Sequence, residues 1–231
     1  MKKGIITAGV LAIITCTVTA YCWAAGNETV SESTKQSLSG QQVESTSQSA
    51  KGKALVVYFS VPETDGVDAS SGASRLVSNG KVMGNTQYIA SVISEATGSD
   101  LFEIKTVHTY PGSHKALIDA AKVEIDNNAR PKLATHIKNL NDYDVVFVGF
   151  PNWWYDMPMP LYSFFDEYDF GGKTVIPFCT HGGSRFSDAI KTIRELEPKA
   201  SVLDGYAIPR DRVSEAKPNV LNWLKRIGMV K

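Results

Sequence analysis

The stretch DVVFVGFPNWWYD, residues 144–156, decides the fold. Residues 145–149 are apolar or small and do not alternate with polar residues, which is typical of a strand buried on both faces of a parallel sheet. The chain leaves this strand at Phe150 and Pro151, and two tryptophans and a tyrosine follow at once. Ligands of open α/β sheets bind at the carboxyl ends of the strands. We therefore expect the aromatic residues to cover something flat.

Outward from this strand, apolar runs of strand length alternate with helical patterns. The other runs cover residues 53–59, 100–106, 173–178 and 201–208, and helical patterns cover residues 86–96, 113–131, 159–168, 188–197 and 218–228. Five strands alternating with five helices predict an α/β fold, a doubly wound three-layer sandwich around a parallel sheet. The side chains expected to face the core are Ile89, Val92, Ile93 and Ala96 in the first helix and Ala116, Ala120, Val123 and Ile125 in the second.

Composition limits the function classes. The chain has 231 residues, with 24 basic and 24 acidic side chains and no net charge, and 43% of its residues are hydrophobic. This is enough for one good core, which we place in a single domain at residues 52–231. The absence of net positive charge and of any basic run argues against nucleic acid as a partner.

The amino-terminal segment has the pattern of an export signal. Two lysines precede an uncharged stretch that ends in small residues, which predicts a signal peptide at residues 1–25, with an uncleaved membrane anchor as the alternative. Residues 26–51 are rich in Ser, Gln and Glu, and we interpret them as a disordered tether. The expected location is extracellular or at the cell surface, and any membrane contact is expected through this segment alone.

Three loops should meet at one edge of the sheet. They contain Ser60 with residues 84–86, residues 151–157, and residues 180–186. In the first loop, a strand and a glycine lead into the start of a helix. This arrangement predicts an anion site, because the first helical turn has unpaired N–H groups and a positive dipole end. The alternative is a plain helix start capped by Asn85 or Thr86. No hydrolase motif or metal-binding motif accompanies these loops, so no metal is expected.

At these residues the sequence resembles the flavodoxin-like family, in particular its exported bacterial branch. The matching pieces are ALVVYFS followed by GNT, DYDVVFVGFPNWW with its MP continuation, and GKTVIPFCTHGGS, and the likeness covers residues 53–231. It implies a five-stranded sheet of order 2-1-3-4-5 with FMN bound where the strand order reverses. By position, it implies phosphate contacts from Ser60, Gly84, Asn85 and Thr86, ring contacts from Pro151, Asn152, Trp153 and Trp154, and polar contacts around the ring from Thr180, His181, Gly182 and Gly183.

Two departures from the family pattern bear on this reading. The serine and the Gly-Asn-Thr triplet of the phosphate loop are normally a few residues apart, whereas here residues 61–83 intervene. The phosphate site survives if this insertion folds outward as a hairpin or lid. The neutral charge also removes the steering toward basic redox partners that acidic flavodoxins use.

Several residues allow two interpretations. The two tryptophans either pack in the core or contact the flavin through at least one ring. His181 either bonds the backbone or acts in catalysis, by balancing charge on reduced flavin or relaying a proton. Cys179 either packs in the core or lies near a site.

The expected function is redox chemistry through FMN. The first hypothesis is an FMN-dependent oxidoreductase at the cell exterior, using NAD(P)H or another donor and passing hydride or electrons to a quinone or other small acceptor. The second is a non-catalytic electron carrier of the flavodoxin type that docks to a redox protein. The third is a flavin-free binding module with the same fold.

Overall fold

The computed structural model describes residues 52–64 and 74–231. The segments interpreted above as export signal and tether lie outside these residues and stay predictions. The strands are β1 (Ala54–Tyr58), β2 (Arg75–Ser78), β3 (Lys81–Gly84), β4 (Asp100–Glu103), β5 (Val145–Pro151), β6 (Thr174–His181), β7 (Ser201–Val202) and β8 (Tyr206–Pro209). The α-helices are α1 (Asn85–Thr97), α2 (His114–Asp126), α3 (Met159–Glu167), α4 (Ala189–Leu196) and α5 (Lys217–Arg226), with 3-10 turns η1 (Leu140–Asp142) and η2 (Arg210–Glu215).

The main sheet is parallel throughout, with the order β4-β1-β5-β6-β7, and β8 also pairs with β6. Apart from the separate hairpin β2–β3, this is the predicted order 2-1-3-4-5, and the predicted fold class is confirmed. One detail differs, because the last predicted strand is split into β7 and β8. Gly205 between them has φ 71°, and a Cβ there would clash with the carbonyl oxygen of Pro177. The chain therefore turns against β6 at Gly205, and two short strands share the fifth position.

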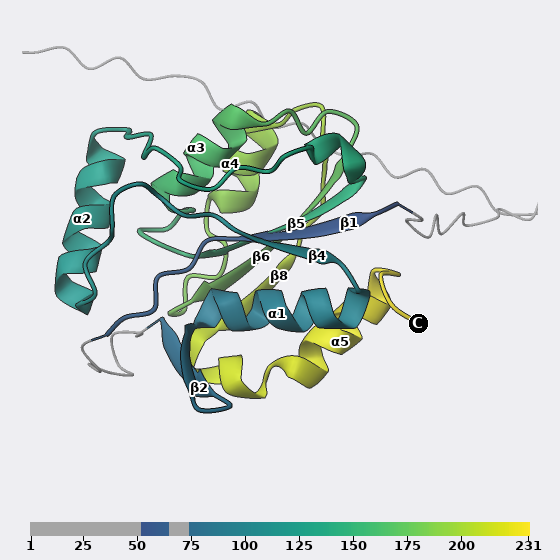
Figure 1. Cartoon of the computed structure of the whole chain (residues 1–231), viewed down its shortest axis with the longest axis horizontal. Coiled ribbons are helices and arrows are strands. Elements are labelled where there is room, and N and C mark those ends of the chain that lie inside the picture. Colours follow the sequence, from purple (N-terminus) through teal and green to yellow (C-terminus); the bar gives the residue numbers. More distant parts are fainter. Residues whose placement is uncertain (1–51, 65–73) are drawn as a thin grey trace, which may run out of the picture. The chain divides into compact units, whose positions relative to one another are not determined.

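Helices cover both faces of the sheet (Figure 1), with α3 and α4 on one side and α1 and α5 on the other. Every residue of β5 is buried. Val146 and Val148 belong to one core cluster with Leu161 of α3, whereas Val145 and Phe147 belong to another with Ile93 of α1. Alternate side chains of one strand thus fill two cores, which explains why its sequence is apolar without alternation.

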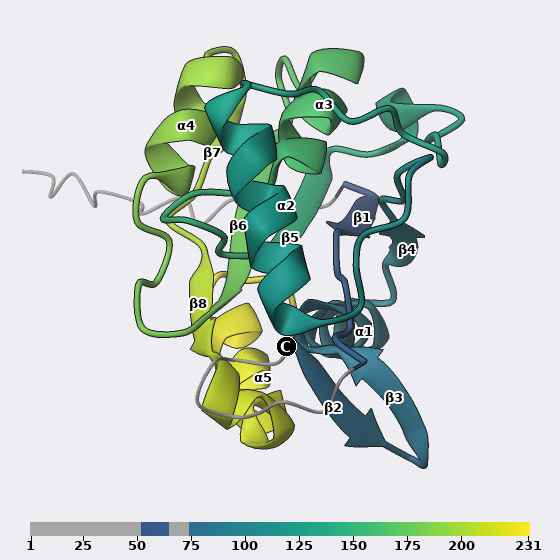
Figure 2. The ribbon, with the colours of Figure 1, turned by 90° about the vertical axis from the view of Figure 1, so that its left-hand side faces the viewer.

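Helix α2 does not bury the face that its sequence predicted. Leu117 and Ala121 are its buried residues, and Val123, which was expected in the core, is 59% exposed. Figure 2 shows α2 standing across the end of the sheet instead of lying along it. The predicted stripe was wrong because the helix packs against loops at the sheet edge.

The insertion after β1 contains an outward hairpin. Strands β2 and β3 pair around the turn residues Asn79 and Gly80, which have φ 51° and 75°. The hairpin projects from the amino-terminal end of α1 (Figure 2), so α1 begins directly after β3. Within the described part of the chain, no helix is both long enough and apolar enough to span a membrane.

Candidate functional site

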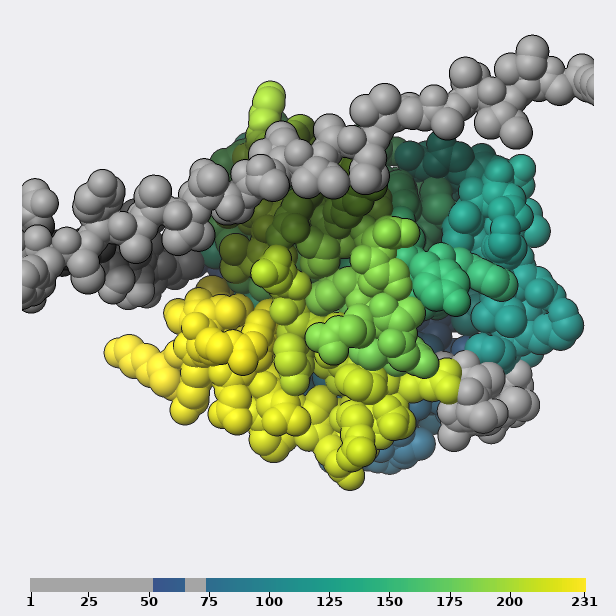
Figure 3. All heavy atoms as spheres, turned by 180° about the vertical axis from the view of Figure 1, so that it is seen from behind, coloured from purple at the N-terminus to yellow at the C-terminus, as the bar shows by residue number. Residues whose placement is uncertain are grey.

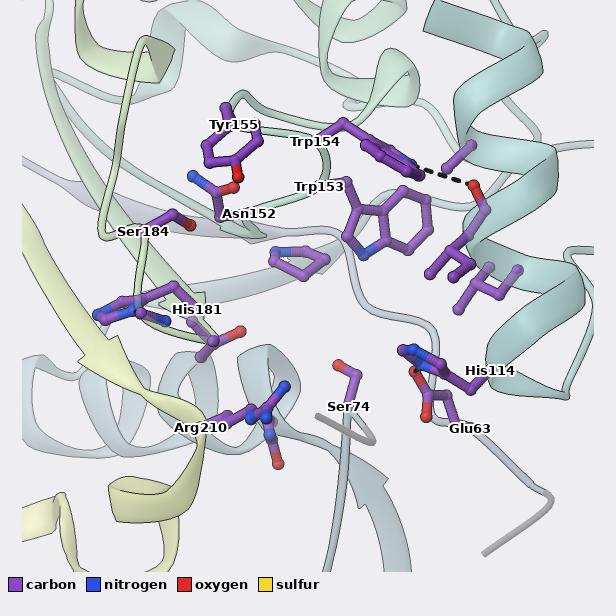
Figure 4. A pocket seen from close by; sticks show the side chains of 18 residues that line it. Glu63, Ser74, His114, Asn152, Trp153, Trp154, Tyr155, His181, Ser184 and Arg210 are labelled. Atoms are coloured by element: carbon purple, nitrogen blue, oxygen red, sulfur yellow. Dashed lines mark hydrogen bonds and ion pairs between the residues drawn. The ribbon is translucent and has the colours of Figure 1, made fainter. Parts of the chain in front are cut away.

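A cavity of about 600 Å³ opens at the carboxyl ends of the central strands (Figure 4). This volume is within the usual range of about 300–1,000 Å³ for small-molecule sites. The cavity is lined by Glu63, Ser74, Asn85, His114, Leu117, Ile118, Ala121, Pro151, Asn152, Trp153, Trp154, Tyr155, Thr180, His181, Gly182, Gly183, Ser184 and Arg210. In the space-filling view the teal lobe of α2 lies at one edge of the molecule, beside green atoms of a later segment (Figure 3).

The structure brings the three expected loops together here. Nine of the residues that the resemblance implies are in the lining, and Ser60, Gly84 and Thr86 lie directly next to it. Thr86 and Thr180 hydrogen-bond through their hydroxyls at 2.8 Å, and both are buried. This bond joins the start of α1 to the end of β6.

Gly84, not Asn85 or Thr86, is the residue that caps α1. The side chain of Gln87 accepts a hydrogen bond from the Gly84 N–H at 3.2 Å. Asn85 and Thr86 are already helical and buried, so the expectation that one of them caps the helix was wrong. A Cβ at Gly84 would clash with Ser60 Oγ, which explains the glycine.

Two serine hydroxyls lie buried beside the positive end of α1 without a hydrogen-bond partner among the described residues. They are Ser60 Oγ and Ser74 Oγ, and the residue Ser74 is only 7% exposed. The carbonyl oxygen of Ser74 accepts the Asn85 N–H at 3.2 Å, which fixes Ser74 to the helix start. Buried hydroxyls are normally satisfied. Their position at a helix amino terminus fits an anion such as a phosphate.

The aromatic loop is a tight and strained turn. Trp153 and Asp156 exchange backbone hydrogen bonds at 3.0 and 3.2 Å, and the two residues between them, Trp154 and Tyr155, have φ 53° and 70°. Left-handed backbone costs about 1–2 kcal/mol for each such residue. The Asp156 carboxylate holds the turn by accepting hydrogen bonds from the hydroxyls of Tyr162 and Thr192. Strain of this kind concentrates at functional sites.

The two tryptophans point to different neighbours. Trp153 makes edge contacts with Phe59 and Tyr110, with ring centroids 5.5 and 5.6 Å apart. Trp154 is 45% exposed, and its indole N–H donates to the carbonyl oxygen of Ile118 in α2 at 3.0 Å. Both line the cavity, so Trp153 combines core packing with a place in the cavity wall.

The third loop is tied to the aromatic loop by backbone contacts. The backbone N–H of Asn152 donates to the carbonyl oxygen of Thr180, and its side-chain amide donates to the carbonyl oxygen of Arg185, both at 2.8 Å. Cys179 is completely buried in β6, and burial raises the pKa of its thiol. Cys179 is therefore a core residue beneath the loop.

His181 has a defined tautomer. Its Nδ1 accepts the backbone N–H of Gly183 at 2.9 Å, so in the neutral ring the proton is on Nε2. Nε2 is buried and has no partner among the described residues. Burial, and then the charge of Arg185, lower the pKa of His181, and the charge of Asp211 opposes them. The ring is thus a neutral hydrogen-bond donor at the cavity wall.

Stability should depend on pH through His181. Its pKa is lowered in the folded protein, so just below the ordinary value of about 6.5 the unfolded chain binds more protons. The free energy of unfolding should therefore fall as the pH is lowered through this window, and His181→Gln should reduce the slope. Urea titrations at several pH values measure it, with the exposed His136→Gln as the control. An equal slope in His181→Gln would assign the pH dependence to other groups.

Sequence reasoning missed a hydrogen-bonded pair of histidine and glutamate in the cavity wall. His114 Nδ1 lies 2.8 Å from Glu63 Oε1, and Glu63 is 3% exposed. The two residues are 51 positions apart and no motif connects them. The described residues contain no cluster of His, Cys, Asp or Glu that could hold a metal ion.

Comparisons with known proteins agree with this fold. Residues 74–227 match the sequence model of a family described as flavodoxin. Two crystal structures of candidate flavoproteins are similar over nearly their whole length. The first, from Bacteroides uniformis, has 29% identity and a TM-score of 0.59, and the match covers 75% of this chain and 98% of that one. The second, from Bacteroides eggerthii, has 26% identity and a TM-score of 0.58, and the match covers 78% of this chain and 99% of that one.

A third similar structure is a Lactobacillus acidophilus flavoprotein in complex with FMN. It has 22% identity and a TM-score of 0.50, with 71% of this chain and 97% of that one covered. No curated protein matches the chain.

Proposed function

The chain belongs to the flavodoxin family, and on this premise we propose that it is an FMN-dependent oxidoreductase whose cofactor binds in the cavity described above. One observation carries the proposal. The buried hydroxyls of Ser60 and Ser74 have no partner among the described residues and lie at the positive end of α1, and Ser74 lines the same cavity as the aromatic loop. A phosphate and a flat ring, the two ends of FMN, are the groups that such a cavity suits.

Different residues of the cavity would contact the phosphate and the ring of the cofactor. Ser60 and Ser74, beside the positive end of α1, would hold the phosphate. Trp153, Trp154 and the 180–184 loop would enclose the ring. His181 would donate from Nε2 to a ring oxygen or nitrogen. FMN supplies the electron-transfer chemistry, and the protein positions it and sets its surroundings.

An enzyme with a small acceptor is favoured over a carrier that docks to proteins. Trp154 and Tyr155 are 45% and 66% exposed at the cavity mouth, which keeps a path open for a small molecule. The chain also has no net charge with which to steer a charged protein partner. We propose a quinone or similar acceptor, reduced outside the cytoplasm, the location that the amino-terminal pattern predicts. Steady-state assays with NADH or NADPH separate the two hypotheses, because a carrier alone should show almost no turnover.

An FMN titration of the purified protein tests cofactor binding. Quenching of tryptophan and flavin fluorescence should give a Kd of about 1 µM or tighter. Riboflavin, which lacks the phosphate, should bind at least about tenfold more weakly, because it leaves the serine hydroxyls unpaired. Failure of FMN to quench either signal would favour the flavin-free binding module.

A further inference from the structure

We propose that Trp153 and Tyr110 form a path by which a single oxidising equivalent leaves the cavity, with Glu124 and His108 as its proton exit. The activity is protective, because it moves a radical from the ligand site to the protein surface. It goes beyond the proposed function, since Tyr110, Glu124 and His108 lie outside the cavity lining.

The path begins at a ring that lines the cavity. Trp153 belongs to the lining (Figure 4). Its ring makes edge contacts with the rings of Tyr110 and Phe59, with centroids 5.6 and 5.5 Å apart. Phe59 also contacts Tyr110, at 5.7 Å, so the three rings pack against one another. These spacings are typical of direct ring contact, and an electron can therefore pass from Tyr110 to Trp153 without crossing solvent.

Two of the three rings can carry the radical, because tryptophan and tyrosine lose an electron far more easily than phenylalanine. Tyr110 is 8% exposed and lies behind Trp153. Burial, and then the hydrogen bond to Glu124, raise the pKa of Tyr110, so its hydroxyl keeps its proton at rest. A phenol that has lost an electron is a strong acid. The proton of Tyr110 must therefore leave together with the electron.

Glu124 is placed to take this proton. The Tyr110 hydroxyl donates to the two carboxylate oxygens of Glu124, at 2.9 and 2.8 Å. His108 Nε2 lies 3.2 Å from Glu124 Oε1, and the His108 side chain is 46% exposed. A carboxylate within hydrogen-bond reach of the proton is a suitable general base, and a histidine beside it can pass a proton to water. The phenolic proton thus has a continuous route to solvent.

Each step moves one electron. An oxidant in the cavity takes an electron from Trp153, and the indole becomes a radical cation. The indole then takes an electron from Tyr110 while the phenolic proton moves to Glu124, which restores Trp153 and leaves a neutral tyrosyl radical. The oxidant is a one-electron acceptor, either an organic radical that enters the cavity or a flavin excited by light. A thiol or ascorbate that reaches the surface at His108 returns a hydrogen atom to Tyr110.

The chain contains a second tryptophan–tyrosine pair that serves as a comparison. Tyr206 and Trp223 stack with ring centroids 5.2 Å apart, but neither residue lines the cavity. Trp223 is 3% exposed. Ring contact alone is thus present at both pairs, and the cavity-lining tryptophan and the carboxylate bonded to the tyrosine distinguish the proposed path.

Pulse radiolysis of the full-length protein without cofactor tests the path. Azide radicals take one electron from accessible indoles. In a background with Trp23→Phe and Trp154→Phe, the remaining tryptophans are Trp153 in the cavity and the buried Trp223. The transient absorption of the indole radical should decay as that of a tyrosyl radical appears.

Three variants in this background identify the carriers. Tyr110→Phe keeps the ring contact and should abolish the tyrosyl signal, whereas the control Tyr206→Phe should leave it unchanged. Glu124→Gln removes the base and should slow the transfer at least about tenfold. A tyrosyl signal that persists in Tyr110→Phe would overturn the path. An unchanged transfer rate in Glu124→Gln would overturn the proton exit, and with it the coupled step proposed here.

Illumination of the FMN-loaded protein separates the two kinds of oxidant. Blue light should generate the tyrosyl radical in the unmodified protein and not in Tyr110→Phe. In that variant the oxidised products of Trp153, measured by mass spectrometry of its peptides, should accumulate faster. A radical that forms after azide attack but not in light would refute the flavin as its source and assign the path to diffusing radicals. Failure to bind FMN would refute the proposed function alone, because the azide experiment does not use the cofactor.

Discussion

Replacing Ser60 and Ser74 together with alanine is expected to lower the affinity for FMN by about 100-fold or more and to leave the affinity for riboflavin unchanged. Each hydroxyl is buried beside the start of α1 and has no partner among the described residues. A hydrogen bond to a charged group contributes about 1.5–3 kcal/mol, so two such bonds correspond to two or more factors of ten. Parallel fluorescence titrations with FMN and riboflavin measure the effect.

Ser163 provides the matched control for this variant. Its hydroxyl is also buried without a described partner, but it lies in α3 and not in the cavity lining. Ser163→Ala should therefore leave FMN binding unchanged. Removing an unsatisfied buried hydroxyl does not destabilise the free protein, so unfolding should not mimic the expected loss. An equal fall in riboflavin affinity would place the two serines near the ring instead of the phosphate.

The sheet could be predicted from sequence because its signals are local. Five apolar residues without alternation at 145–149 required burial on both faces, and the structure places both faces of β5 in cores. The order of the strands came from the resemblance and is confirmed. The split of the last strand depends on one backbone angle at Gly205, and a strand pattern does not show such an angle.

The site could be predicted only where it follows directly from a strand. The residues of loops 151–154 and 180–183 line the cavity because they leave β5 and β6 at its edge. Ser74, Glu63 and His114 were missed because each meets its neighbours only after the chain has folded across a long insertion or a helix. The buried face of α2 was predicted one residue too early, at Ala116 and Ala120 instead of Leu117 and Ala121. The sequence pattern alone does not show whether a helix faces a sheet or a cavity.

Replacing Trp154 and Tyr155 with Asn and Gly should stabilise the free protein and weaken FMN binding. The chain already uses Asn79-Gly80 for the turn between β2 and β3, with nearly the same pair of positive φ angles. Relief of strain at two residues, less the cost of a glycine and of the lost indole hydrogen bond to Ile118, should raise the free energy of unfolding by about 1 kcal/mol. Two lost aromatic contacts should lower FMN affinity about 10- to 100-fold.

The control variant places the two aromatic residues in the other turn that has positive φ angles. Asn79→Trp with Gly80→Tyr puts the strained pair into the hairpin, away from the cavity lining, and should destabilise the protein without changing FMN affinity. Urea denaturation of the free protein and FMN titration measure the two quantities separately. Normal FMN binding by the Trp154→Asn, Tyr155→Gly variant would mean that the strain at 154 and 155 serves no flavin contact. If the prediction holds, the strained aromatic turn lowers the free energy of unfolding by about 1 kcal/mol and provides a preformed binding site for the flavin ring.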